Sequence, residues 1–385
     1  MRRAVIVGAG IAGLAAAARL GRDGWRTTVV ERAPGRRSSG YLVNLLGSGY
    51  DAAQRLGLLP ALSDRALGSF STVLVRADGR PKFTVPAALA EATLGPHAMT
   101  VFRGDLEAAL YAAAREHTEF RFGTTVTAIE QDADRVRVTL SDGSTEEADL
   151  LVGADGVHSA TRTSVFGAQY RVDLPYVVAA VPLAEPVAEV PESSATTFIG
   201  PGRTAAVISL GPGRSSAFFT YRCEDPGWEV ARGALDALRA AFADLGGGIP
   251  EALRQLATDP ASAYFDQVSQ VVMPRWSDGR VLLLGDAAWC VTLFAGHGAA
   301  LALAGADRLG TALNRPDQDI PTALAGWGAA LRPEVVKRQA LARRGMHQYA
   351  PPSRVHVWLN DVTMRAITLP GVRGVLRRAV ERQNG

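Results

Sequence analysis

The stretch "RAVIVGAGIAGLAAAARLGRDGWRTTVVER", residues 3–32, decides the fold. Its apolar run Ala4–Val7 predicts a short strand buried on both faces, as in a parallel sheet. The alanine-rich segment Ala15–Arg19 predicts a helix. Thr27–Val30 predicts a second strand, so the order strand, helix, strand indicates an α/β, Rossmann-like domain.

The turn between the first strand and the helix carries glycines in G-x-G-x-x-G spacing. Gly8 permits a tight turn, Gly10 lets the backbone approach a pyrophosphate, and Gly13 lets the helix pack on the strand. Ile11 and Ala12 open the helix, whose unpaired N–H groups and positive dipole end face the phosphates. This context predicts a dinucleotide site.

Glu31 ends the second strand, where an acidic residue accepts hydrogen bonds from a ribose. Its carboxylate would repel a 2′-phosphate, so this site is predicted to take FAD or NAD and not NADP. Arg32, the next residue, is expected to lie against the adenine.

Two later segments repeat the pattern of a buried strand that ends in an acidic turn. Leu150–Val152 is followed by Asp155, and Val281–Leu284 is followed by Gly285 and Asp286. Parallel strands end at one edge of a sheet, so both turns should reach the same crevice. Asp286 is followed by a loop and then by the start of a helix, which should face the pyrophosphate or the flavin. The residues expected there are Gly296, Gly298 and Ala299.

In this order, the motifs resemble those of class A FAD-dependent monooxygenases of the para-hydroxybenzoate hydroxylase type. The resemblance implies that the first motif binds the ADP half of FAD, that the Asp155 motif serves FAD and the reduced nicotinamide, and that Asp286 holds the ribityl chain. Arg103 in "VFRGDLEAAL" matches a residue that reaches the FAD chain, and Val126 matches the contact beside the adenine. The implied fold is a Rossmann-like FAD-binding domain with an inserted antiparallel β-sheet for the substrate and C-terminal helices.

The FAD-binding domain is expected to be discontinuous, in three pieces: residues 1–70, 98–172 and 272–345. β-rich runs between Pro-Gly turns place the substrate sheet in 71–97 and 173–271, with a helix over Val230–Leu245. Residues 346–385 are expected to form a C-terminal helical segment with a break at Pro370-Gly371.

The chain departs from the family pattern in the loop after Asp286. Trp289 stands where the family has histidine, Leu293 where it has proline, and Ala300 where it has asparagine. Leu293 either keeps the same loop path or weakens stabilisation of the oxygenated flavin, and the sequence leaves both open. His297 is either a general base for a phenol or a solvated loop residue.

The candidate substrate-binding residues are apolar or aromatic, with one amide. They are Tyr41, Asn44, Phe198, Phe218, Trp289 and Phe294. The sheet residues among them could equally pack a core, whereas Trp289 and Phe294 lie on the loop expected beside the flavin. A large apolar cavity would suit a polycyclic or polyketide-like molecule.

The resemblance implies a monooxygenase that hydroxylates or epoxidises a bulky apolar small molecule. NAD(P)H would reduce FAD, and molecular oxygen would form a flavin C4a-hydroperoxide that oxygenates the substrate. One alternative is an FAD-bound cyclase or rearrangement enzyme of natural-product biosynthesis without net redox. Another is a flavin-binding protein without turnover.

The composition of the chain bears on its partners and its location. The 385 residues carry a net charge of +3 with scattered arginines, which does not indicate a nucleic-acid partner. No apolar run reaches the ~18 residues of a membrane span. Cys223 and Cys290 make no disulfide framework or metal motif, which favours a cytoplasmic location. For the oligomeric state, a monomer and a dimer are both left open.

Overall fold

A six-stranded sheet in the order β17-β18-β11-β1-β2-β7 carries the nucleotide-binding motifs. In the computed structural model, which describes residues 1–36, 41–94, 97–211 and 213–368, all neighbouring pairs are parallel except β17 with β18. The strands are β1 (Arg3–Val7), β2 (Arg26–Glu31), β7 (Thr118–Phe122), β11 (Leu150–Gly153), β17 (Ser277–Asp278) and β18 (Val281–Leu283).

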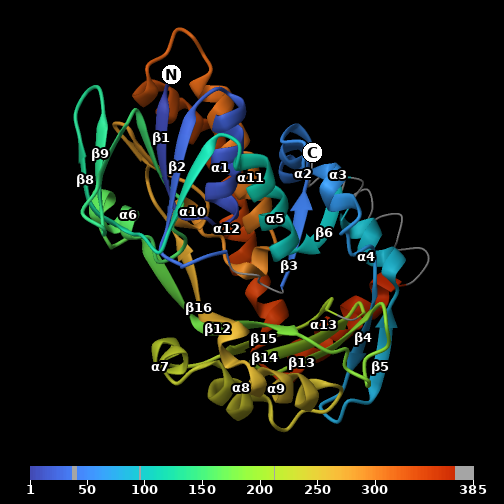
Figure 1. Ribbon diagram of the computed structural model, residues 1–385. Coiled ribbons are helices and arrows are strands. Elements are labelled where there is room, and N and C mark those ends of the chain that lie inside the picture. Colours follow the sequence, from blue (N-terminus) through green and yellow to red (C-terminus); the bar gives the residue numbers. More distant parts are fainter. Residues whose placement is uncertain (37–40, 95–96, 212, 369–385) are drawn as a thin grey trace.

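Two different layers cover the faces of this sheet (Figure 1). Helices α1, α5 and α11 pack on one face, and the three-stranded sheet β10-β9-β8 packs on the other. The helices of this half are α1 (Ile11–Arg22), α2 (Ser48–Arg55), α3 (Leu59–Ser63), α5 (Arg103–Ala114), α6 (Ala160–Phe166), α10 (Asp286–Trp289), α11 (Gly298–Leu313) and α12 (Ile320–Tyr349). Its additional strands are β3 (Leu42–Leu46), β6 (Ala98–Phe102), β8 (Val126–Gln131), β9 (Val136–Leu140) and β10 (Thr145–Ala148).

A second sheet of seven strands lies below the first in Figure 1, in the order β16-β12-β15-β14-β13-β4-β5. Its strands are β4 (Ser71–Val75), β5 (Pro81–Val85), β12 (Arg171–Leu183), β13 (Ser194–Gly200), β14 (Arg203–Ser209), β15 (Ser215–Arg222) and β16 (Tyr264–Val271). The helices near it are α4 (Ala87–Leu94), α7 (Pro226–Ala231), α8 (Ala234–Phe242), α9 (Ile249–Thr258) and α13 (Arg354–Thr368).

Two details of this second half differ from the sequence expectation. The sheet is not wholly antiparallel, because β4 runs parallel to β13. The two strands come from separate segments of the chain, so no hairpin turn forces them to be antiparallel. The helix expected over Val230–Leu245 is two helices, α7 and α8, because Gly233 between them has a φ of +88° that ends α7.

The two faces of the seven-stranded sheet have different neighbours. On β14 and β15, Val207 and Phe219 point into an apolar core with α8 and α9. Side chains alternate between the two faces along a strand. Ile208, which follows Val207, and Phe218, which precedes Phe219, therefore point to the other face of the sheet. That other face looks toward the six-stranded sheet (Figure 1).

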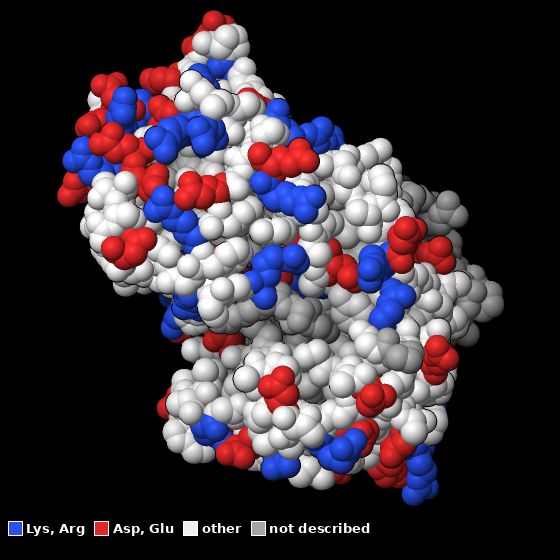
Figure 2. Space-filling view, in the orientation of Figure 1, with Lys and Arg blue, Asp and Glu red and all other residues white. Residues whose placement is uncertain are grey.

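The C-terminal part connects the two halves. Helix α12 runs between the two sheets in Figure 1, and α13 then packs on β5 and β13. Residues 369–385, which include the second predicted helical stretch, lie outside the described residues. Among the residues that the structure describes, no helix is both long and apolar enough to cross a bilayer. On the face shown in Figure 2, basic and acidic side chains are interspersed.

The alternation on β15 makes a matched pair of stability predictions. Phe219→Ala should lower the free energy of unfolding by about 3–5 kcal/mol, because it leaves a cavity in a fully buried core. Phe218→Ala should lower it by clearly less, because that side chain is only half-buried. Urea denaturation of both variants measures the difference, and equal losses would contradict the assigned faces.

Candidate functional site

A cavity of about 1610 Å³ lies where the parallel strands of the first sheet end. Its wall includes the residue that follows β1, Gly8, and the last residue of β2, Glu31. It also includes Asp155 and Asp286, which follow β11 and β18. Ligands of open α/β sheets bind at this carboxyl edge. The three predicted turns and the end of β2 therefore meet in one cavity.

The glycine turn is shaped for close approach. Gly8 has a φ of +104°, and a Cβ on Gly13 would lie 1.9 Å from the Gly8 carbonyl oxygen. Gly13 therefore lies behind the cavity wall as a packing residue, whereas Gly10, Ile11 and Ala12 line the cavity. The N-terminus of α1 has no side-chain cap and no acidic residue in its first turn, which leaves its N–H groups for an anion such as pyrophosphate.

Glu31 is fixed at the end of β2 by two backbone donors. Its Oε2 accepts from the Ala9 N–H at 2.8 Å and its Oε1 accepts from the Ala33 N–H at 2.8 Å. Arg32 and Val126 line the same end of the cavity. A carboxylate oxygen can accept more than one hydrogen bond, so Glu31 keeps the capacity to accept from a ribose hydroxyl.

The carboxylate of Asp155 accepts hydrogen bonds from residues that follow it closely in the chain. Its Oδ1 accepts from the Ser159 hydroxyl at 2.5 Å, and its Oδ2 accepts from the Thr161 N–H at 2.9 Å. The buried Arg162 donates to the Ala287 carbonyl at 3.0 Å and to the Val157 carbonyl at 2.7 Å. The D-G motif is thereby held against α10, beside Asp286.

Arg103 organises the middle of the cavity. It donates to the Tyr41 hydroxyl at 2.9 Å and pairs with Glu107 at 2.8 Å. The Tyr41 ring lies 5.7 Å from that of Tyr264. Burial raises the pKa of Tyr41, so its phenol stays protonated. Burial also raises the pKa of Asp286, against the opposing effect of Arg103. This cluster offers donors and acceptors to a polyhydroxyl chain.

Two predicted substrate residues do not line the cavity. Phe198 pairs in register with Ala205, on the face that packs against α8 and α9, and it lies against Arg203. Trp289 is fully buried, with its ring 4.7 Å from Trp276 in a tryptophan cluster behind the loop. These placements argue against substrate contact for either residue. The other four candidates, Tyr41, Asn44, Phe218 and Phe294, all line the cavity.

The loop from Cys290 to Gly298 forms the next part of the wall. Leu293, Gly296, Gly298 and Ala299 line the cavity, whereas Gly285 lies behind it against Ala12. His297 is not among the described wall residues. Its Nδ1 donates to the Ala295 carbonyl, and burial lowers the pKa of its ring. This position gives little support to a general-base role.

Several wall residues were not identified from the sequence. Tyr264 on β16 and Tyr349 at the end of α12 are far from every motif, and no local pattern marks them. Cys290 and Thr292 lie in the loop that departs from the family, and that departure was the available signal. His158, which bonds Asp266 at 2.8 Å, lies within the D-G motif.

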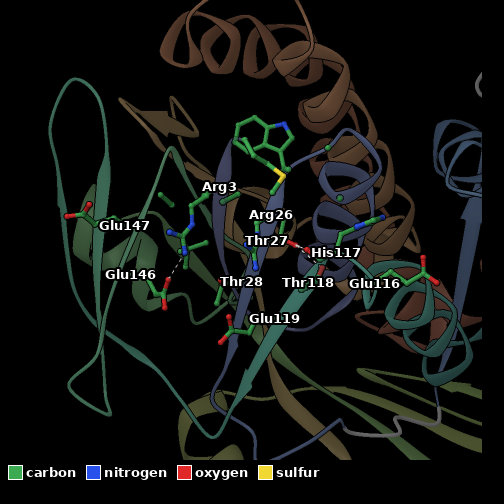
Figure 3. Close-up of a pocket in the computed structure, with 17 residues that line it drawn as sticks. Arg3, Arg26, Thr27, Thr28, Glu116, His117, Thr118, Glu119, Glu146 and Glu147 are labelled. Carbon is green, nitrogen blue, oxygen red and sulfur yellow. Dashed lines mark hydrogen bonds and ion pairs between the residues drawn. The ribbon is translucent and has the colours of Figure 1, made fainter.

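A smaller pocket of about 640 Å³ lies at the amino ends of β1 and β2, with Arg3, Thr27 and Glu146 in its wall (Figure 3). Ligands of α/β sheets bind at the opposite edge, so this pocket is not the candidate site. No group of three or more His, Cys, Asp or Glu side chains suited to a metal occurs among the described residues.

Comparisons with known proteins agree with this geometry. The sequence matches the FAD binding domain family over residues 2–317. It is 30% identical over 368 residues to an uncharacterised protein of Mycobacterium tuberculosis strain H37Rv, covering 91% of this chain and 95% of the relative. It is 27% identical over 410 residues to the FAD-dependent monooxygenase asL4 of Sarocladium schorii, and the match covers 95% of this chain and 92% of the relative.

Among solved structures, the tetracycline destructase Tet(51) superposes with a TM-score of 0.82 at 26% identity, covering 98% of each chain. The fold and site define a flavoprotein oxidoreductase, and the glycine cradle and the free N-terminus of α1 fit FAD. The chain belongs to the family of class A FAD-dependent monooxygenases.

His297 makes a pH prediction for the apoprotein. Its pKa is lowered on folding, so the unfolded chain binds more protons below the ordinary value of about 6.5. Stability contributed by the neutral ring should therefore decrease as the pH falls from 7 to 5. His297→Asn should make the free energy of unfolding less dependent on pH in this window, as measured by urea denaturation. An unchanged pH dependence would contradict this assignment.

Proposed function

We propose that this monooxygenase hydroxylates or epoxidises a bulky, largely apolar aromatic or polycyclic molecule, with NAD(P)H as reductant and molecular oxygen as co-substrate. The observation that carries the proposal is the extent of the cavity. Its volume of about 1610 Å³ exceeds the ~300–1,000 Å³ of a typical single-ligand pocket. It runs from the FAD motifs to the seven-stranded sheet and has room for a second molecule.

The seven-stranded sheet forms the floor of the cavity, where small side chains flank one aromatic ring. Phe218 lies in register between Ala180 on β12 and Ala206 on β14. All three residues line the cavity, together with Ile208 and Val178. Alanines on both sides leave the Phe218 ring accessible to a flat ligand, and aromatic rings favour offset or edge contacts with such a ligand.

An aromatic wall stands at the side of this floor. The Phe294 ring stacks on that of Tyr349 at 5.0 Å and meets that of Tyr176 edge-on at 6.1 Å. Phe294 and Tyr349 line the cavity, so a polycyclic ligand on the floor would contact them from the side. The wall also limits the access of water to the reacting atoms.

The charge of the floor favours a neutral ligand. The described wall residues from the seven-stranded sheet include no Lys or Arg, and their charged member is Asp266. A small carboxylate substrate would find no countercharge there, and burying it unpaired would be unfavourable. The tetracycline destructase that this chain resembles carries a polycyclic compound in its name, which supports the same substrate class.

The residues divide into those that hold FAD and those that hold the substrate. Gly10, Glu31, Arg103 and Asp286 would bind FAD, which supplies the redox chemistry when bound. Asn44, whose Oδ1 accepts from Thr100 at 2.8 Å, keeps its amide NH₂ group for a polar substituent of the substrate.

The direct test is anaerobic reduction of the FAD-loaded enzyme with NADH or NADPH, followed by oxygen, with three- and four-ring phenols as candidate substrates. We expect hydroxylated product in amounts that follow the added NAD(P)H, and binding that improves with ring number. Product formation without NAD(P)H and oxygen would instead support a cyclase or rearrangement enzyme. Bound FAD that neither nicotinamide reduces would support a flavin-binding protein without turnover.

Ala206 should set the size limit of the floor. Ala206→Phe adds a large side chain beside Phe218 and should weaken binding of a four-ring probe by about 10-fold or more, because the ring cannot lie flat. A one-ring probe and FAD should bind as before, and Ala206→Ser serves as the control. Fluorescence titration measures each affinity, and equal losses for both probe sizes would contradict the predicted floor.

A further inference from the structure

Tyr264, the first residue of β16, faces the cavity from the seven-stranded sheet. Its chain neighbours Ala263 and Phe265 pack against the core with α8 and α9, so alternation turns Tyr264 to the opposite face. There it packs in the same apolar cluster as Phe218, and it lines the cavity. The side chain therefore belongs to the ligand face of the sheet.

The Tyr264 hydroxyl is unpaired and accessible. Among the described residues it has no hydrogen-bond partner, whereas the hydroxyl of the adjacent Tyr41 pairs with Arg103 at 2.9 Å. Its oxygen keeps accessible surface, unlike the buried and unpaired Oγ1 of Thr161. Burial of the side chain raises the pKa of Tyr264 well above its ordinary value, so the hydroxyl stays protonated. It is therefore a donor that a molecule in the cavity can reach.

Tyr264 stands at one end of a row of residues that crosses the floor. It pairs in register with Ala180 on β12, and Ala180 pairs with Phe218 on β15. Residues paired in this way lie on the same face of a sheet. Neighbouring strands are about 4.8 Å apart, so the backbones at Tyr264 and Phe218 are about 10 Å apart, with only the methyl group of Ala180 between them. A flat ring above Ala180 would have one edge at the Tyr264 hydroxyl.

This end of the row is the end beside the cofactor residues. The Tyr264 ring lies 5.7 Å from that of Tyr41, whose hydroxyl is bonded by Arg103. On the basis of the proposed function, we propose that the Tyr264 hydroxyl donates a hydrogen bond to a carbonyl or phenolic oxygen of the substrate. The contact would set which edge of the polycyclic ligand faces FAD.

A donor at this position makes the floor selective. A hydrocarbon that covers the hydroxyl removes its water and returns no hydrogen bond, which is unfavourable. A ligand of similar shape with an oxygen at that edge replaces the lost water. Sites built in this way reject analogues that lack the bonding group. Tyr264 is thereby a specificity-determining residue that selects oxygen-bearing polycyclic compounds over plain hydrocarbons.

The test compares 9-fluorenone with fluorene, two three-ring probes of similar shape of which only the first carries a carbonyl acceptor. Tyr264→Phe removes the hydroxyl and keeps the ring. We expect the ratio of the fluorene to the fluorenone dissociation constant to fall about 5-fold in Tyr264→Phe, because only fluorenone loses affinity. Fluorescence titration of the FAD-loaded proteins measures each constant. The control is Tyr50→Phe, which should keep the wild-type ratio, since Tyr50 lies against His97 and is not among the described wall residues.

The outcomes separate the Tyr264 contact from the proposed function. A wild-type ratio in Tyr264→Phe would overturn the contact and leave the polycyclic substrate class intact. A wild-type ratio together with a changed FAD affinity and visible spectrum would also overturn it, because the hydroxyl would then bind the cofactor. If the ratio falls as expected but no polycyclic phenol is oxygenated with NAD(P)H and oxygen, the contact stands and the proposed monooxygenation fails.

Discussion

The close contact between Gly13 and Gly8 is the constraint on which the cofactor side of the molecule depends. Any side chain at position 13 would occupy the space of the Gly8 carbonyl, so α1 can lie against the turn after β1 only with glycine there. This contact aims the N-terminus of α1 at the cavity. The buried alanines that follow, Ala15–Ala18, continue the close packing along the helix. The position of the N–H groups that we propose bind the pyrophosphate is thus set by the absence of a side chain at residue 13.

The two sheets contribute to the cavity in different ways. The parallel sheet presents strand ends, where backbone N–H groups and the carboxylates of Glu31 and Asp286 gather regardless of what lies along the strands. The seven-stranded sheet presents part of one face, where alternating side chains such as Ala206 and Ile208 on β14 line the cavity. In the proposed function, recognition of FAD would therefore rest largely on backbone geometry, and recognition of the substrate on side-chain size and shape.

This difference explains how much could be predicted from the sequence. The positions of Gly8, Glu31, Asp155 and Asp286 at one edge follow from local motifs, because each motif contains its own strand and turn. The face of a strand in a sheet depends on register with its neighbours, which a single segment does not contain. The sequence therefore predicts Phe198 and Phe218 alike as substrate contacts, whereas the pairing of Phe198 with Ala205 turns Phe198 toward α8. The place of Tyr264 in the cavity wall is likewise visible only in the folded chain.

The two faces of β14 and β15 also bear on how the substrate preference of such an enzyme can change during evolution. Residues such as Val207 and Phe219 hold the sheet to its helices, and their neighbours Ile208 and Phe218 line the cavity. Most substitutions that reshape the ligand face leave the core beneath it unchanged, since the strand backbone separates the two. Descendants of this chain can therefore explore new substrates by successive single replacements while the fold and its cofactor stay the same.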